Sequence, residues 1–518
     1  MNSLARPLFI RLVGALLGWL VLARAPALAQ TPLPAAPPDS LLRLSEEGRP
    51  AALPPVVVPT DTLVRISACP GRGPRVRVMG LLFVGNDITR ERTLRAELNI
   101  REGDSLDVAD LRERLEANRR RLYNLQLFHT VLVQASCTGA GQVIILFNVQ
   151  ERWYVLPTPI FSIAETNFQR WWQRPDRWQR LDYGLHVVHT NFRGRAEQLT
   201  ANLQLGFNRK YELFYEAPGF GRRRRVGVGF GISYYQSRNL DYTTDNDRLK
   251  SLPAPEEDAF PIQRFYVSGG LRLRHTVQFV TAIDLSFHRE LISDSIFRLN
   301  PDYFLGNTQR KYVELSVVSS NNQRNTFAYP LTGRFMQAAV SFRQFLGSSA
   351  APAYATVRLR YAHYFSLGHQ FYYALGLWGQ ARLLANRYAY PDSRALGYEA
   401  LVRGYDAYVV EGRAYGLVQQ GLSYRAWAPP PLRIPFIDNP KINTLPLALY
   451  VNLFADAGLA GGRLGRPEQP ANQLPGRLLA SAGVGLHVVT YYDRVFCFEV
   501  SRTAQNQTGF FIRSSFPI

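Results

Sequence analysis

Residues 153 to 518 alternate between apolar and polar positions with a period of two. The odd positions from Leu447 to Ala455 are apolar, whereas the even positions of the same stretch include Asn452 and Asp456. A period of two is the spacing at which the side chains of a β-strand share one face of a sheet. We count about sixteen such stretches and no convincing helix, which predicts a large sheet with one apolar face and one polar or glycine-rich face.

A soluble β-sandwich also alternates, but further features favour a membrane β-barrel. The stretches run for about 10 residues or more, long enough for a tilted strand to cross a bilayer. Aromatic pairs such as Tyr234-Tyr235 and Tyr491-Tyr492 stand near the ends of stretches, where interfacial girdles lie. Short connections such as Arg193-Gly194 alternate with long ones such as Asn239 to Phe260, as in outer-membrane barrels.

The first thirty residues have the layout of a secretory signal. Arginines precede an apolar stretch from Leu12 to Ala23, and an Ala-x-Ala site follows at residues 27–29. The apolar stretch is about 12 residues long, too short to span a bilayer, so cleavage of residues 1–29 is favoured over an uncleaved anchor. Residues 30–74 then read as an extended, proline-rich linker.

Residues 75–152 predict a small α/β domain with the order β-α-α-β-β. Thr89 and Asp107 are the expected N-caps of the two helices, because their side-chain oxygens can accept from unpaired helical N–H groups. The expected elements are a strand over 75–84, helices over 90–98 and from 108 onward, and strands over 130–135 and 142–150.

The chain has three cysteines. Cys69 and Cys137 flank the small domain, and an exported chain can oxidise them, but sequence cannot place their sulfurs within bonding distance. The sequence therefore leaves open whether this pair forms a disulfide. Cys497 stands alone in a strand-like segment, and no His/Cys spacing indicates a metal site.

Composition excludes several classes of protein. A hydrophobic fraction of 46% with 12% aromatic residues excludes a disordered chain. A mean hydropathy of −0.15, without an apolar run of about 20 residues after the first thirty, excludes a bundle of membrane helices. The net charge is +20. Because many arginines alternate with apolar residues along strands, they indicate a basic lumen or rim facing anionic lipid, and no nucleic-acid partner is expected.

Short motifs in both parts of the chain resemble one family of bacterial outer-membrane proteins. In residues 75–152 they are Gly85-Asn86, Gly103-Asp104 and Leu122-Tyr123-Asn124 leading to Phe128. In residues 153–518 they are, in order, Asn191-Phe192-Arg193-Gly194-Arg195 with Tyr215-Glu216-Ala217-Pro218, Tyr329-Pro330-Leu331-Thr332-Gly333, Val402-Arg403-Gly404-Tyr405 and Phe454-Ala455-Asp456-Ala457-Gly458. The small domain resembles a POTRA domain, and the whole chain resembles the BamA/TamA family of outer-membrane assembly and translocation proteins.

This resemblance implies a fold. It is mainly β, with a transmembrane antiparallel β-barrel of about sixteen strands over residues 153–518, of the bacterial surface antigen type. One small POTRA-like α/β domain over residues 75–152 precedes the barrel.

The resemblance also implies that the long segment 386–412 is an extracellular loop folded back into the barrel. Its Arg403, flanked by Val402, Gly404 and Tyr405, then pairs with an acidic residue on a nearby strand. Alternation turns Asp456 inward, in the motif that runs from Phe454 to Gly458, so its carboxylate can accept a bidentate pair from Arg403. Without the resemblance, Arg403 reads as an ordinary exposed loop residue.

One position departs from the family pattern. The family usually has Glu two residues before Arg on the strand that follows the loop, and here Ser423 stands in that place before Arg425. Alternation still turns Ser423 inward, so the register survives. A second acidic partner of Arg403 is left unidentified, because no spacing selects Glu399 or Glu411.

The chain ends in a strand-like segment. Phe510, Ile512, Phe516 and Ile518 share one face, and the resemblance implies that this closing strand also signals for assembly. Pro517 lacks a backbone donor, which a strand edge tolerates.

The resemblance implies a non-enzymatic protein of the outer membrane, with its N-terminal domain in the periplasm. It would insert, fold or translocate unfolded outer-membrane or secreted client polypeptides, through the edge of the small sheet and the barrel seam. Outer-membrane lipid is an expected partner, accessory periplasmic or outer-membrane subunits are left open, and no cofactor is expected.

Two alternatives remain open at this point. A passive channel or porin for small solutes would not need a POTRA-like domain. A barrel-borne lipase or protease is less favoured, because the chain has no G-x-S-x-G, P-loop, dinucleotide or H-E-x-x-H motif.

Overall fold

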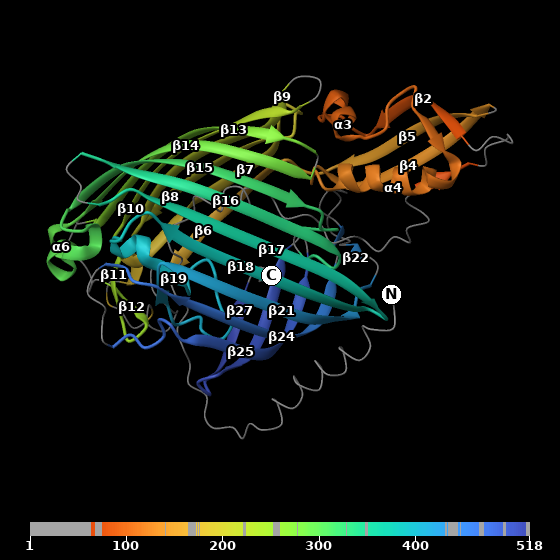
Figure 1. Cartoon of the computed structure of the whole chain (residues 1–518). Helices are drawn as coiled ribbons and strands as arrows, with labels where there is room; N and C mark the ends of the chain where they lie inside the picture. The colour runs from red at the N-terminus through yellow and green to blue at the C-terminus, as the bar shows by residue number, and fades with distance from the viewer. Residues whose placement is uncertain are drawn as a thin grey trace. The chain divides into compact units, whose positions relative to one another are not determined.

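The computed structural model describes 64–67, 75–139, 141–163, 172, 175, 177–220, 224–251, 260–276, 278–327, 329–347, 351–429, 432–433, 444–445, 447–465, 471–490 and 494–513. The expected signal peptide and most of the expected linker lie outside these residues. Two bodies are recognisable in Figure 1, a small α/β domain and a large sheet whose strands curve round as in a barrel.

The small domain is a five-stranded sheet in the order β1-β4-β5-β2-β3, with two helices. Its buried face is apolar and includes Val143, Ile145, Phe147 and Val149, which alternate along β5 as the sequence predicts. Its elements are β1 (Val64–Ile66), β2 (Arg75–Val84), α3 (Glu91–Glu97), β3 (Ser105–Asp107), α4 (Val108–Tyr123), β4 (Phe128–Gly139) and β5 (Gln142–Glu151).

The N-cap residue is as predicted for α4 but not for α3. Arg90 is the N-cap of α3, and Thr89 instead hydrogen-bonds through its hydroxyl to Tyr154. Asp107 does occupy the N-cap position of α4, but its carboxylate accepts no cap hydrogen bond. It accepts from Nε of Arg75 at 3.0 Å. In both cases a tertiary partner competes with the local cap, which sequence spacing does not reveal.

The edges of this small sheet carry two short strands. β1 pairs in parallel with β4, with Val64 opposite Val133 and Ile66 opposite Ala135. β3 pairs antiparallel with β2 over Arg75–Arg77. Among the described residues, β1 and β3 therefore form the outer edge where they pair, and β4 and β2 form it elsewhere.

The second body is one antiparallel sheet of sixteen strands, ordered from β27 through β26, β25, β24, β21, β18, β17, β16, β15, β14, β13, β10, β9, β8 and β7 to β6. The predicted fold class is confirmed. The strands are β6 (Val155–Ile163), β7 (Leu181–Phe192), β8 (Glu197–Gly206), β9 (Arg209–Phe220), β10 (Val226–Ser237), β13 (Ile262–Arg274), β14 (Phe279–Ile292), β15 (Gln309–Asn322), β16 (Gly333–Leu346), β17 (Tyr354–Gly368), β18 (Phe371–Leu383), β21 (Ala414–Trp427), β24 (Ala448–Gly461), β25 (Leu478–Val489), β26 (Val495–Thr503) and β27 (Thr508–Arg513).

The connections carry short elements. They are β11 (Asp241–Asp245), β12 (Arg248–Ser251), β19 (Arg394–Leu396), β20 (Val410–Glu411), β22 (Leu432–Arg433), β23 (Thr444–Leu445), helix α6 (Asp294–Leu299) and three 3₁₀ turns at Arg177–Arg180, Pro301–Phe304 and Tyr390–Ser393. No helix of the described residues is long and apolar enough to cross a membrane.

Side chains divide between the two faces of the large sheet as alternation predicts. On β24, Val451 and Leu453 are exposed on the outer face, whereas Asn452, Phe454 and Asp456 are buried inside. An exposed apolar position recurs on strand after strand, for example at Leu203, Leu213, Phe230, Leu285, Leu315, Val340, Leu359, Leu377, Val418, Leu486 and Val500. Such a continuous apolar exterior suits contact with lipid.

The two end strands of the sheet are short or lack backbone donors. β27 has six residues, and β6 contains Pro157 and Pro159, which have no N–H to donate. Within the described part of the chain, the first and last strands, β6 and β27, share no backbone ladder.

Candidate functional site: a loop locked inside the barrel

The site lies on the loop that joins β18 and β21. Leu383 ends β18 and Ala414 begins β21, so the loop has the extent that the sequence predicts. Its side chains include some of the most buried in the molecule, such as Tyr390, Arg403 and Tyr405. A buried loop needs partners for its polar groups, and these come from the inner face of the sheet.

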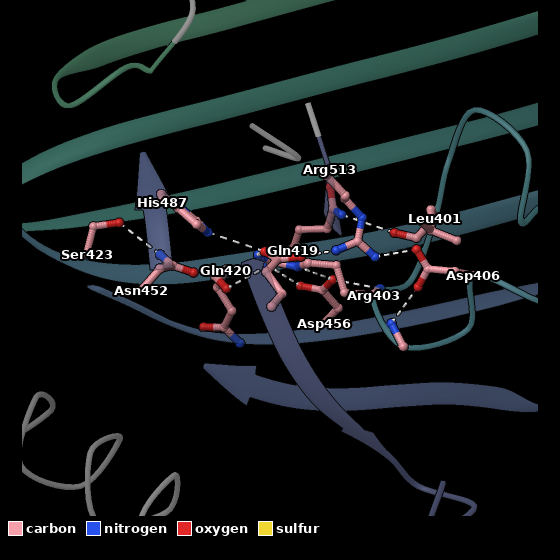
Figure 2. A network of polar contacts seen from close by, with 12 residues as sticks. Leu401, Arg403, Asp406, Gln419, Gln420, Ser423, Asn452, Asp456, His487 and Arg513 are labelled. Atoms are coloured by element: carbon pink, nitrogen blue, oxygen red, sulfur yellow. Dashed lines mark hydrogen bonds and ion pairs between the residues drawn. The ribbon is translucent and has the colours of Figure 1, made fainter. Parts of the chain in front are cut away.

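Arg403 forms a bidentate ion pair with Asp456 of β24 (Figure 2). Its Nε donates to Oδ2 at 2.8 Å and its Nη2 to Oδ1 at 2.5 Å, and its backbone N–H donates to Oδ2 at 3.1 Å. The side chains are 1% and 0% exposed. The structure thus brings together the two residues that the sequence motifs single out.

Packing around the guanidinium explains the small residues of both motifs. The Phe454 ring centroid lies 4.0 Å from the Arg403 guanidinium carbon, a cation–π contact. Gly404 has φ +93°, and a Cβ there would lie 2.8 Å from Ser501 Oγ. A Cβ at Gly458 would lie 2.7 Å from Cγ2 of Val402. Glycine at both positions lets the loop approach the wall.

The second carboxylate beside Arg403 is Glu499 of β26. Its Oε1 lies 3.6 Å from Nη1 of Arg403, and its side chain is fully buried. Neither sequence candidate occupies this place: Glu411 accepts from the Ser393 hydroxyl, and Glu399 lies 3.9 Å from Arg358. The sequence alternation could have predicted that Glu499 points inward, because its neighbours Phe498 and Val500 are apolar and point outward.

Arg513 connects the loop to the last strand. It lies on β27 and pairs with Glu499 of β26 and with Asp406 of the loop. Asp406 in turn accepts from the backbone N–H of Gly404 at 3.0 Å. One network therefore joins the loop, two inner strands and the strand at the end of the sheet (Figure 2).

Comparison with known proteins identifies the family. A family model described as "Omp85 superfamily domain" matches residues 191–490, more than half of the chain. The chain belongs to the Omp85 superfamily. A second model, named POTRA and described as "Surface antigen variable number repeat", matches residues 76–152. The resemblance predicted from the motifs is confirmed.

Solved structures give weaker likenesses. BamA from Haemophilus ducreyi lacking POTRA domains 1–3 is 17% identical with a TM-score of 0.45, over 85% of this chain and 83% of that one. CdiB from Acinetobacter baumannii is 18% identical with a TM-score of 0.46, and CdiB from Escherichia coli is 12% identical with a TM-score of 0.48. Both CdiB matches cover 85% of this chain and 74% of the other. No curated protein matches the chain.

The loop of this Omp85 chain has a second anchor on another part of the wall. Asp392 is buried between Arg310 of β15 and Arg343 of β16, which donate to it at 2.7 and 2.8 Å. These arginines also pair with Glu290 and Glu314 of the neighbouring strands. The loop is therefore tied at Asp392 to β15 and β16, and at Arg403 to β24.

Hydrogen bonds to backbone carbonyls hold the segment between the anchors. Arg382 of β18 donates to the carbonyls of Arg394 at 2.7 Å and Gly412 at 3.1 Å. Gln419 of β21 donates to Leu401 O at 3.1 Å. Since these acceptors would otherwise be buried without partners, the loop needs the wall in order to keep this path.

The remaining predicted site residues lie elsewhere. Phe510 and Ile512 are exposed on the outer face of β27, and Phe516 and Ile518 lie outside the described residues, so their role as a strand signal stays a prediction. Cys137 is in a disulfide, and Cys497 is a buried thiol. Cys69 lies outside the described residues, so its pairing with Cys137 stays a prediction. No cluster that could hold a metal ion occurs in the described part of the chain.

Proposed function

We propose that this Omp85 protein resides in the outer membrane, with its POTRA domain in the periplasm, and assembles, inserts or translocates other polypeptides. The observation that carries the proposal is the combination of a POTRA domain with a sixteen-stranded sheet in which one end strand, β27, is short and the other, β6, contains two prolines. Such end strands leave backbone donors and acceptors available to an incoming client strand. Energy would come from client folding, and no cofactor is involved.

The end strand β27 is the better candidate for client pairing. The POTRA sheet also has uncovered edge, but β1 and β3 cover part of β4 and β2. A client strand there would meet an edge that changes strand partway along, from β1 to β4 or from β3 to β2. We therefore assign first contact to the POTRA edge and strand addition to β27.

A porin function is the alternative that must be tested against this one. The anchored loop argues against an open pore, because Asp392 and Arg403 fix it to separate parts of the inner wall. Depletion of the protein separates the two functions. Loss of folded barrel proteins or surface-exported proteins supports the assembly function. Normal levels of both, with a fall in small-solute uptake, would favour the channel.

Photocrosslinking tests the site of client pairing. A crosslinking residue replaces Phe510 on β27 in one variant and Leu359 on β17 in the matched control. The two positions are equally exposed, at 58% and 59%, but β17 lies in the middle of the sheet with a partner on either side. We expect crosslinks to client chains from position 510 alone. Equal crosslinking from both positions would indicate nonspecific contact and refute pairing at β27.

A further inference from the structure

The connection between β15 and β16 enters the barrel from the end opposite to the loop. Consecutive antiparallel strands are joined at alternate ends, so this connection and the loop between β18 and β21 lie at opposite ends of the sheet. Tyr329 of this connection is buried against Tyr450 of β24, with ring centroids 4.5 Å apart. Leu331 packs in the same apolar cluster, with Val489 and Val495 of the facing wall.

Local hydrogen bonds hold Tyr329 in this position. The Thr326 hydroxyl donates to the Tyr329 carbonyl at 2.9 Å. Asn325 accepts through its side-chain oxygen from the backbone N–H groups of Leu331 and Thr332. These hydrogen bonds accompany the packing of Tyr329 on the β24–β25 wall, away from β15 and β16, the two strands that the connection joins.

The Tyr329 hydroxyl is part of a chain of polar groups. Asn452 Nδ2 donates to Ser423 Oγ at 2.8 Å (Figure 2). Ser423 Oγ lies 3.2 Å from the Tyr329 hydroxyl, which lies 2.9 Å from Nδ1 of His487. The other ring nitrogen of His487, Nε2, lies 3.4 Å from Glu499 Oε1. Glu499 is the carboxylate beside Arg403.

Asn452 fills one of the two acceptor sites of Ser423 Oγ. The direction in which both hydroxyls donate as well as accept runs from Ser423 to the Tyr329 oxygen and from the Tyr329 hydroxyl to Nδ1 of His487. A histidine that accepts at Nδ1 carries its proton on Nε2, which faces Glu499. Gly485 makes the room, since a Cβ there would lie 2.9 Å from Glu499 Cγ and 3.1 Å from His487 Nε2.

We propose that Tyr329 is a positioning residue of the loop lock. Acting through His487, whose Nε2 faces Glu499 Oε1 at 3.4 Å, it holds Glu499 beside Arg403, so that the loop from one end of the barrel and the turn from the other are joined by one chain of buried polar contacts. Ser423, which stands where the family usually has Glu, then has the role of donating a hydrogen bond to Tyr329. Any effect of the chain on client handling rests on the proposed function, whereas the chain itself does not.

The tautomer of His487 is the first test. The protein has eight histidines, so ¹⁵N-histidine NMR in detergent micelles is tractable, and a His487→Gln variant identifies the signals of His487. We expect a neutral ring with its proton on Nε2 and none on Nδ1. A proton on Nδ1 in the wild-type protein overturns the proposal, and this measurement requires no Tyr329 variant to fold.

The second test compares two tyrosine hydroxyls. Tyr329→Phe keeps the ring on Tyr450 and removes only the hydroxyl. Tyr373→Phe is the control, because its hydroxyl donates to Gln420 Oε1 at 2.8 Å and is not part of the chain. Hydrogen exchange of the amides from Val402 to Tyr405 should rise about tenfold in Tyr329→Phe, the effect of leaving a buried polar partner unpaired. A rise no larger than in Tyr373→Phe overturns the proposal.

Client assembly is measured separately, in cells depleted of the protein. If the tautomer and the exchange rates are as expected but client levels are normal after depletion, the proposed function fails and the lock stands. If client levels fall on depletion but His487 carries its proton on Nδ1, the proposed function stands and the role of Tyr329 fails.

Discussion

Arg403→Ala is the sharpest perturbation of the loop lock. It removes the two side-chain hydrogen bonds to the Asp456 carboxylate, one to the Gln420 carbonyl at 3.1 Å and the cation–π contact with Phe454, and it keeps the backbone hydrogen bond to Asp456. It also leaves Asp456 without its cation in a site closed to water. Removing one partner of a buried pair costs about 3–5 kcal/mol. If that cost falls on loop docking, the population of undocked loop rises by about 10²- to 10⁴-fold.

Hydrogen exchange followed by mass spectrometry measures this population. The amides from Val402 to Tyr405 report on local opening of the loop, because the barrel strands open only at higher free energy. Arg403→Lys should fall between wild type and Arg403→Ala, since lysine keeps the charge but loses the planar fork that matches the carboxylate.

Arg387→Ala is the matched control on the same loop. Arg387 pairs with Asp302 at 2.8 Å but is about half exposed, and surface pairs contribute about 0–1 kcal/mol. In Arg387→Ala we expect the hydrogen-exchange rate of the amides from Val402 to Tyr405 to change by less than about fivefold. If Arg403→Ala and Arg387→Ala raise exchange equally, burial does not strengthen the Arg403 pair, and the reasoning is refuted.

Three further perturbations test other parts of the network. Gly458→Ala places a methyl against Val402 and should destabilise the docked loop by about 1–3 kcal/mol, measured by the same exchange; an unchanged rate would contradict close packing there. Asp392→Asn weakens the second anchor by about 1–3 kcal/mol and should speed exchange near residue 392 before residue 403. Arg513→Gln breaks the link to Asp406 and should raise exchange in β27 as well as in the loop, whereas a change confined to β27 would show that the two are uncoupled.

Much of the fold could be predicted because alternation is a local property. A residue two positions along a strand returns to the same face whatever lies beyond it, so the inward position of Asp456 followed from its neighbours. The prediction of Thr89 as a cap was wrong, and Asp107 occupies its N-cap position without the expected side-chain hydrogen bond, for the opposite reason. Thr89 and Asp107 each found a partner distant in sequence, Tyr154 and Arg75.

The sequence by itself determined the strand pattern, the family motifs and the residue types of the Arg403–Asp456 pair. Only the tertiary structure decided the partners around it. Glu499, Arg513 and Tyr329 come from three other segments, and their meeting depends on sheet register and on how far the loop and the turn enter the lumen. Those distances are set by packing across the barrel. Such packing produces no periodic pattern of residues within any one segment, so the sequence does not predict it.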